Sequence, residues 1–471
     1  MVFSAGADTL VLPAGLRVIE EYAFYGDTSI TSVALPDGLE EIGAYAFAGC
    51  TNLTEINLPD GVHTIGAGAF EGTPCHPLAK AGTTAAGTAI RAQIPLEIDF
   101  LDPADETRWQ VGMYFSFHHD EYCLDSVCIN PEATPVVDVV VPDGVESINE
   151  RAFEGLSGIT GVVLPDSLRG IGAYAFDGCS ALVNMGLPDN MVWIHENAFA
   201  GTDCRPMAFA GRPTAAKAIE MQIPLEIDFL DPEDETKWQI GMYFSFHDSE
   251  YCLDSVCINP EASPVVDVVV PDGVESINER AFEGLSGITG VVLPDSLRGI
   301  GAYAFDGCSA LVNMGLPDNM VWIHENAFAG TDCRPMAFAG RPTAAKAIEM
   351  QIPLEIDFLD PADETKWQLA MNLSFHDGAY CLDHAYVNAD ATPVTAIVLP
   401  DGIEGIGPFA FHQATQAEID RFEAITVPAS VAWIDDYAFD ACTNATLLVY
   451  GGSYAETWAA ANSFPHQTIA E

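Results

Sequence analysis

The chain has 471 residues, of which 49% are hydrophobic, so it is long enough to bury an extended core. Its 17 basic and 69 acidic residues give a net charge of −52, which excludes nucleic acid and anionic membrane as partners because both carry the same sign. No apolar run reaches the roughly 18 residues of a membrane-spanning helix. The charge leaves two interpretations open: solubility of an exposed protein, or attraction of a cationic partner.

The first eight residues have neither the basic region nor the apolar region of a signal peptide. A repeat begins at Leu10 without the polar cap that usually opens a repeat array. We therefore expect this chain to be a segment of a longer protein that carries its signal and anchor elsewhere.

A block of sequence recurs four times at a spacing of 129 residues, and residues 135–232 are identical to residues 264–361. Inside each block a unit of 23 residues recurs, starting for example at Ile30, Leu53 and Val136. Self-similarity at this period predicts a solenoid in which each turn buries its apolar residues against its neighbours.

Each short unit contains two strand-like stretches. In the unit that starts at Leu53, Ile56 alternates with Glu55 and Asn57, the period of a half-buried strand, and a Pro-Asp-Gly turn follows before the second stretch at residues 62–65. A phenylalanine recurs at one position of every unit, which predicts a ladder of stacked rings in the core. The ladder comprises Phe24, Phe47, Phe70, Phe153, Phe176, Phe199, Phe282, Phe305, Phe328, Phe411 and Phe439.

Three insertions interrupt the repeats. Each follows a short helical stretch such as residues 214–221, and each then alternates apolar and polar residues, for example from Trp109 to Phe117. A turn at 118–121 and a second strand at 122–129 complete a predicted β-hairpin. The predicted order is repeat array 1–92, insert 93–135, array 136–221, insert 222–264, array 265–350, insert 351–393 and a last array with closing segment at 394–471.

The twelve cysteines include three pairs with a spacing of 25 residues, about one turn of the solenoid. Cys50 and Cys75 form one such pair, and adjacent turns would bring the two thiols close enough for a disulfide in an exported protein. Cys442 occupies the same slot without a partner, which favours small buried thiols that fill the core.

The pattern L-x-x-I-x-L-P-x-x-L-x-x-I-G-x-x-A-F-x-x-C resembles the BspA-like class of leucine-rich repeats, and residues 447–462 resemble the segment that often ends such arrays. The resemblance implies a mostly β, α/β solenoid of curved and elongated parallel-sheet arrays, here interrupted by β-hairpin modules. It also implies a cell-surface or secreted protein that adheres to host matrix or to other cells. The family has no shared catalytic residues to transfer.

Motifs of common enzymes are missing from the sequence. It contains no His-Glu-x-x-His, no Gly-x-Ser-x-Gly, no phosphate-binding glycine loop and no Cys-x-x-Cys. We therefore expect a protein without catalytic activity and without a required cofactor.

The first candidate site is the outward side of the first strand of each unit, which the resemblance places on the concave face. Its side chains are short of charge for so acidic a protein, which permits close approach by a ligand, although small residues also relieve crowding on a curved face. The residues are Ser32, Glu55, Asn57, Asp138, Val140, Val163, Asn184, Asp267, Val269, Val292 and Asn313.

The second candidate is a tryptophan that recurs once per block, at Trp193, Trp322 and Trp433. Alternation with the following isoleucine points each indole outward, where it would stack on a sugar ring or anchor a protein. A closing segment packed over each indole is the alternative, which we favour because indoles are usually buried.

The third candidate is an acidic loop that recurs in every insert and suggests a Ca²⁺ site. A solvated acidic turn is the alternative, which we favour because the spacing lacks the pattern of an EF-hand. The loop residues are Asp99, Asp102, Asp105, Glu106, Asp228, Asp231, Asp234, Glu235, Asp357, Asp360, Asp363 and Glu364.

The sequence as a whole predicts a non-enzymatic surface protein that binds an extracellular protein or glycan at several equal sites, because near-identical blocks multiply a weak affinity. Association between copies of the chain stays open. The alternative is a structural spacer that holds another domain of a longer parent protein, since identical copies fit that role too.

Overall fold

The computed structural model describes residues 9–118, 120–183, 185–247, 249–376, 378–412 and 415–470. The chain divides into two units, Met1–Asp228 and Phe229–Glu471. Both are built mainly from short parallel strands stacked turn upon turn, which confirms the predicted mostly β solenoid. Among the described residues, no helix combines the length and apolar character needed to cross a membrane.

The first array shows the basic turn of the solenoid, which contributes one strand to each of two parallel sheets. The first-strand row pairs Ser32 with Glu55, and the second-strand row pairs Glu41 with Thr64, so the register in both rows equals the 23-residue repeat. The first-strand row comprises β1 (Thr9–Val11), β3 (Ser32–Ala34) and β5 (Glu55–Ile56). The second-strand row comprises β2 (Val18–Ile19), β4 (Glu41–Ile42) and β6 (Thr64–Ile65).

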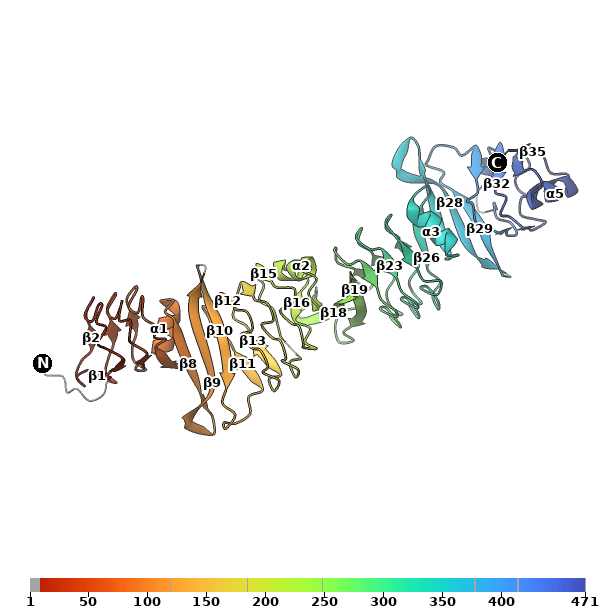
Figure 1. The fold of residues 1–471 in the computed structure, drawn as a ribbon. Helices are drawn as coiled ribbons and strands as arrows, with labels where there is room; N and C mark the ends of the chain where they lie inside the picture. The colour runs from red at the N-terminus through yellow and green to blue at the C-terminus, as the bar shows by residue number, and fades with distance from the viewer. Residues whose placement is uncertain are drawn as a thin grey trace. The chain divides into compact units, whose positions relative to one another are not determined.

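Long antiparallel strands form the first insert, and they stand out beside the short strands of the arrays (Figure 1). Residues 105–118 and 121–129 form the predicted β-hairpin. The stretch that opens the insert is itself a strand, so this hairpin is part of a three-stranded meander. The insert and the elements before it are β7 (Leu78–Lys80), α1 (Thr84–Arg91), β8 (Leu96–Asp102), β9 (Asp105–His118) and β10 (Glu121–Ile129).

The meander joins different rows of the two arrays that it links. Its first strand β8 pairs with β7, which continues the first-strand row, whereas its last strand β10 pairs with β12 of the second-strand row. The next first-strand row must therefore begin anew at β11. The elements that complete this unit are β11 (Asp138–Val140), β12 (Ser147–Ile148), β13 (Gly161–Val163), β14 (Gly170–Ile171), β15 (Trp193–Ile194), β16 (Met207–Phe209) and α2 (Pro213–Glu220). The helix confirms the one predicted at 214–221, and the unit boundary falls inside β17 (Leu225–Asp231).

The second unit starts with a two-stranded part of an insert and continues as stacked turns. Its sheet β18-β19-β21-β23-β25 leads from that insert into a second-strand row. These strands are β18 (Asp234–His247), β19 (Glu250–Ile258), β21 (Ser276–Ile277), β23 (Gly299–Ile300) and β25 (Trp322–Ile323). The first-strand row beside it comprises β20 (Asp267–Val269), β22 (Gly290–Val292), β24 (Asn313–Gly315) and β26 (Arg334–Phe338).

The third insert repeats the switch of rows within one nine-stranded sheet. The order β26-β27-β28-β29-β31-β33 runs from a first-strand row through the meander into a second-strand row. A separate sheet β30-β32-β34-β35 then begins at β30. The elements are α3 (Pro342–Glu349), β27 (Leu354–Asp360), β28 (Asp363–His376), β29 (Ala379–Val387), β30 (Ala396–Val398), β31 (Gly405–Ile406), α4 (Gln416–Ile419), β32 (Ala424–Val427), β33 (Trp433–Ile434), β34 (Thr446–Tyr450), α5 (Tyr454–Ala461) and β35 (His466–Ile469).

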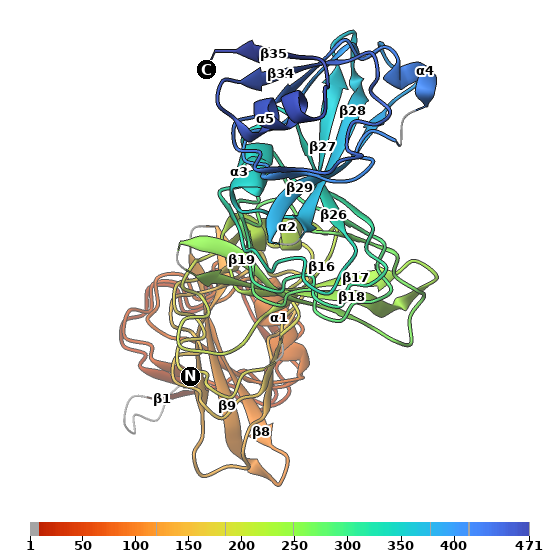
Figure 2. The same cartoon turned by 90° about the vertical axis from the view of Figure 1, so that its right-hand side faces the viewer.

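Stacked phenylalanine rings form the core, as predicted. Ring centroids of successive turns lie 4.9–5.5 Å apart. The Phe153 amide also donates to the Ala175 carbonyl of the next turn at 2.8 Å, so each ring is held by its backbone as well. Helix α5 lies beside β34 and β35 (Figure 2), and its Trp458 packs against Phe439 at 5.6 Å, where it covers the last ring of the ladder.

All twelve cysteines are free thiols, which agrees with the buried-thiol interpretation. The Cys179 thiol donates to the Phe153 carbonyl at 3.1 Å, and Cys50 and Cys308 make the same bond in their turns. Burial raises the pKa of the Cys179 thiol to about 11, so it stays protonated and unreactive at neutral pH.

Replacing one ring of the ladder should destabilise its array strongly. We expect Phe47→Ala to lower the free energy of unfolding by about 3–5 kcal/mol, because Phe47 is fully buried between two other rings. Urea unfolding followed by circular dichroism measures the change. The control is Tyr25→Ala, since Tyr25 is 62% exposed and should cost less than about 1 kcal/mol. Equal losses in both variants would contradict the ladder.

Candidate functional site

The first-strand rows alternate as predicted, with one residue buried in the core and its neighbours outside. Val33, Ile56 and Val139 are buried, while Ser32 is half-buried and the other predicted residues with described side chains are exposed. These exposed residues are Glu55, Asn57, Asp138, Val140, Val163, Asp267, Val269 and Val292. Asn184 lies outside the described residues, and Asn313 is placed by its backbone at the start of β24.

One hollow in the first array brings together the predicted residues Ser32, Glu55 and Asn57. Its volume is about 820 Å³, and His76, Lys80 and Glu97 also line it. Sequence reasoning missed these three residues because they lie beyond the regular units, in or next to β7 and β8. The parallel register that places Leu78 beside Asn57 is the signal that would have found them.

The strip changes character in the next two arrays, where valine replaces the polar residues. Val140 and Val163 lie side by side in paired strands and are 53% and 56% exposed. Val269 and Val292 repeat this pair in the second unit with almost equal exposure. The same pair of exposed apolar side chains therefore occurs on equivalent strands of the two units.

The recurring tryptophans lie flat on the preceding turn of the solenoid. A Cβ atom added to Gly170 would fall 2.1 Å from Cε2 of Trp193, and one added to Gly299 would fall 2.2 Å from Cε2 of Trp322. The register pairs each tryptophan with that glycine. The indoles therefore pack on the preceding turn, where we expected a closing segment to cover them. Part of each ring stays accessible, with 36% of Trp322 and 40% of Trp433 exposed.

Aspartates of the acidic loop accept hydrogen bonds from other residues of the same insert. Both carboxylate oxygens of Asp102 accept hydrogen bonds from Thr134, at 2.9 Å from the amide and 2.6 Å from the hydroxyl, and one also accepts from the Ala104 amide. These bonds lower the pKa of Asp102. Asp231 is held in the same way by Ser263, and Asp105 accepts from the amide and hydroxyl of Thr107.

This use of the loop leaves the calcium interpretation without support from the geometry. Its acidic residues are spread over a strand, a turn and the start of the next strand, as the pairing of Asp99 with Gly112 and of Asp102 with Asp105 shows. In the part of the chain that the structure describes, no three His, Cys, Asp or Glu side chains gather closely enough to hold a metal ion.

One aspartate per insert has an unusual environment. Burial first, and the nearby Glu97 second, raise the pKa of Asp99 to about 6. Asp357 is the corresponding residue of the third insert; its pKa is also raised to about 6, and one of its carboxylate oxygens is buried without a hydrogen-bond partner. Asp228 has the same shift in the second copy.

The raised pKa predicts a pH-dependent stability. The folded chain keeps a proton on Asp357 at pH values where the unfolded chain, with an ordinary value of 3.8, has lost it. The stabilisation is complete below pH 4 and is lost as the pH rises through 6. Asparagine does not ionise, so Asp357→Asn should be more stable than the wild type at pH 7.5 by about 1–3 kcal/mol, and the gain should vanish near pH 4.

Asp363→Asn is the matched control for thermal unfolding across this pH range. Hydrogen bonds from Thr365 and Lys366 lower the pKa of Asp363, so its contribution has the opposite sign and is lost as the pH falls. This variant should gain no stability at pH 7.5. A wild type and an Asp357→Asn variant that melt together at pH 7.5 would show that the Asp357 carboxylate is well solvated.

The tryptophan packing is tested at the glycines. Gly170→Ala and Gly299→Ala should push the indoles off the sheet, which would shift their fluorescence to longer wavelength and cost about 1–3 kcal/mol per site. Gly158→Ala and Gly287→Ala are the controls, because a Cβ at either position meets no atom within 4 Å. Unchanged emission and melting in the first pair would refute the packing of the indoles on the glycines.

Comparison with known proteins identifies similar structures and the family of the chain. Similar solved structures include a leucine-rich cell surface protein from Faecalibacterium prausnitzii, with 21% identity over 96% of this chain and 90% of that chain at a TM-score of 0.20. A leucine-rich repeat protein from Bacteroides ovatus has 16% identity over 98% and 84%, and the pneumococcal vaccine antigen PcpA has 14% over 98% and 79%, both at a TM-score of 0.20. No curated protein matches the chain.

The family model described as BspA type leucine-rich repeat region matches residues 4–84, 132–212, 261–341 and 384–457. The matches coincide with the stacked turns of the solenoid and extend over more than half of the chain. The chain belongs to the BspA-type leucine-rich repeat family.

Proposed function

We propose that this chain is a non-enzymatic protein of the cell surface or of secretions, and that it binds an extracellular protein or glycan through the outward face of its first-strand rows. The observation that carries the proposal is the recurrence of the exposed pair Val140 and Val163 as Val269 and Val292 on equivalent strands. Location at the surface rests on the resemblance to the BspA-like proteins.

Multivalency follows from the repetition. A target with several copies of its own motif, such as a fibrous matrix or a glycan coat, engages the second patch at a high effective concentration once the first is bound. Weak individual contacts then add up to firm attachment. The polar hollow lined by Ser32, Glu55 and Asn57 offers a different surface, so the first array contributes a distinct contact to the same target.

A spacer is the second candidate, and the identity of residues 135–232 and 264–361 favours it, because that identity includes buried and exposed positions alike. A spacer conserves length and stiffness between its copies, whereas a binding protein depends on its exposed strip. Substitutions confined to that strip therefore separate the two functions.

The test is a binding screen of the full chain on immobilised collagen, fibronectin, laminin and a glycan array. We expect saturable binding to at least one surface, and a loss of at least about tenfold in affinity for the double variant Val163→Asp and Val292→Asp, because each change places a charge in an apolar contact. The controls are Val192→Asp and Val321→Asp, which change exposed valines next to the second-strand rows.

The melting temperature of both double variants should match that of the wild type, since all four valines are more than half exposed. Equal binding by the strip variant and its control would remove the strip from the proposal. Absence of binding to every surface would favour the spacer.

A further inference from the structure

The switch of rows at each insert leaves a strand with a free edge. Strand β11 pairs with β13 on one side, and no strand pairs with its other side among the residues that the structure describes. The Val137 carbonyl accepts from the Thr160 amide at 2.6 Å, and the Val141 amide donates to the Val163 carbonyl at 2.9 Å. Because backbone groups alternate in direction along a strand, those of Asp138 and Val140 point to the free edge.

Strand β30 of the second unit has the same arrangement. It is the first strand of the sheet β30-β32-β34-β35. The Thr395 carbonyl accepts from the Glu423 amide at 2.7 Å, and the Leu399 amide donates to the Thr426 carbonyl at 3.0 Å. The amides and carbonyls of Ala396 and Val398 are therefore the ones that face away from β32.

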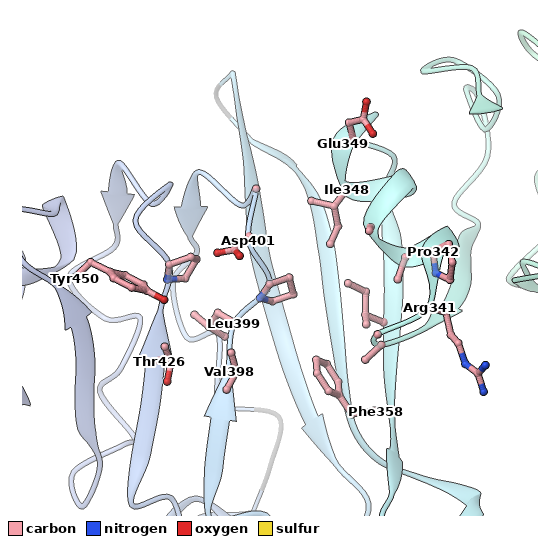
Figure 3. Close-up of a pocket in the computed structure, with 18 residues that line it drawn as sticks. Arg341, Pro342, Ile348, Glu349, Phe358, Val398, Leu399, Asp401, Thr426 and Tyr450 are labelled. Atoms are coloured by element: carbon pink, nitrogen blue, oxygen red, sulfur yellow. The ribbon is translucent and has the colours of Figure 1, made fainter. Parts of the chain in front are cut away.

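An apolar groove runs beside each free edge. In the second unit it has a volume of about 890 Å³ and lies between β30 on one side and α3 with β27 on the other (Figure 3). Ile348, Ile356, Phe358 and Val398 line it. The groove of the first unit has a volume of about 510 Å³ and is lined by the equivalent residues Ile90, Ile98, Phe100 and Val140.

One end of each groove is closed by a contact between the helix and the turn after the edge strand. A Cβ added to Gly402 would fall 2.7 Å from Cγ2 of Ile348, and one added to Gly144 would fall 2.6 Å from Cγ2 of Ile90. Both glycines have positive φ, which suits residues without a Cβ. The helix is thus held at a fixed distance from the edge strand, and the groove is part of the fold.

The negative charge of the chain favours a positively charged occupant of the groove. Glu349 and Asp401 line the groove of the second unit, and Arg91 and Asp143 take their places in the first. Glu349 is already paired with Lys346 at 3.1 Å, so the attraction to a basic segment comes from Asp401, from Asp143 and from the net charge of the chain. The guanidinium of Arg341 lies 3.6 Å from Asp318, so this cation is already paired. With a net charge of −52, the chain repels a second copy of itself and attracts a basic segment.

We propose that each of these two grooves binds an extended, basic polypeptide segment of a partner protein, which adds to β11 or β30 as a further strand. Its backbone bonds to the free amides and carbonyls of the edge strand. Its apolar side chains, at every second position, cover the isoleucines and the phenylalanine of the groove. Its lysine or arginine side chains, at the positions between, face solvent and the acidic residues nearby.

This inference goes beyond the proposed function, because it concerns the free strand edge and names the chemistry of a partner, although the groove of the first unit shares Val140 with the exposed valine pair. The probe is a blocked decapeptide of alternating valine and lysine, and its counterpart of alternating valine and glutamate is the charge control. Hydrogen exchange of the full chain, read peptide by peptide with mass spectrometry, should show slower exchange at Asp138 and Val140 and at Ala396 and Val398 with the lysine peptide only.

Proline at the edge is the selective variant. Val140→Pro and Val398→Pro each remove one amide that faces the free edge, and an edge strand tolerates proline at such a position. We expect each change to abolish peptide-induced protection at its own strand and to weaken binding there at least tenfold. Protection at the other strand should persist. Val140→Thr and Val398→Thr keep the amide and serve as matched controls that bind normally.

The outcomes separate clearly. No protection by the lysine peptide, equal protection by the glutamate peptide, or protection that survives the proline changes would each overturn the proposal. Protection of both edges in the protein alone as its concentration rises would assign the grooves to self-association instead. Should a proline variant unfold, the peptide effect on the wild type still decides. Failure here leaves the Val163 and Val292 surface untouched, because neither residue lines a groove.

Discussion

The registration of each turn on the one before it is the constraint from which the rest of the structure follows. Two short parallel ladders and a stacked phenylalanine recur with the same spacing, and Cys50, Cys179 and Cys308 each bond to the previous turn once per block. In the regular turns a residue therefore meets its own equivalent 23 positions away, as Gly170 meets Trp193, whereas Gly405 and Trp433 of the last array pair across 28 positions. Where one turn carries a large side chain, the paired residue of the preceding turn must be small. Gly170 and Gly299 are such residues, because they leave room for the indoles of Trp193 and Trp322.

The inserts also pair their backbone with the neighbouring turns, but they connect the first-strand row of one array to the second-strand row of the next. A meander that enters through the first-strand row and leaves through the second-strand row keeps every one of its own strands paired. The first strand of the next first-strand row, β11 or β30, is therefore left with one edge unpaired among the described residues. A free strand edge is normally a hazard for aggregation, and here acidic residues and a net charge of −52 surround it. The same features that protect the edge define the partner that can use it.

The periodic part of the fold was predictable from the sequence, because period 23 and strand alternation are local patterns. The ring ladder and the outward strip follow from them. Strand β8 was not predicted although Leu96 and Ile98 alternate with Glu97 and Asp99, because the two-residue period breaks at Phe100 and Leu101, where the pairing with β9 also shifts register. Bonds such as those from Thr134 to Asp102 span 32 residues and leave no local signal. The polar hollow at His76 and the free edges also depend on pairing between distant segments.

Removing one block tests most directly whether the near-identical blocks bind one target at the same time. Deletion of residues 136–264 joins equivalent positions of the repeat and leaves an otherwise intact solenoid with one valine pair fewer. On a surface of the matrix and glycan panel that retains the full chain, the shortened chain should dissociate at least about tenfold faster, while its melting temperature stays the same. Equal dissociation rates of the two chains would contradict multivalent binding and leave the deleted block as a spacer.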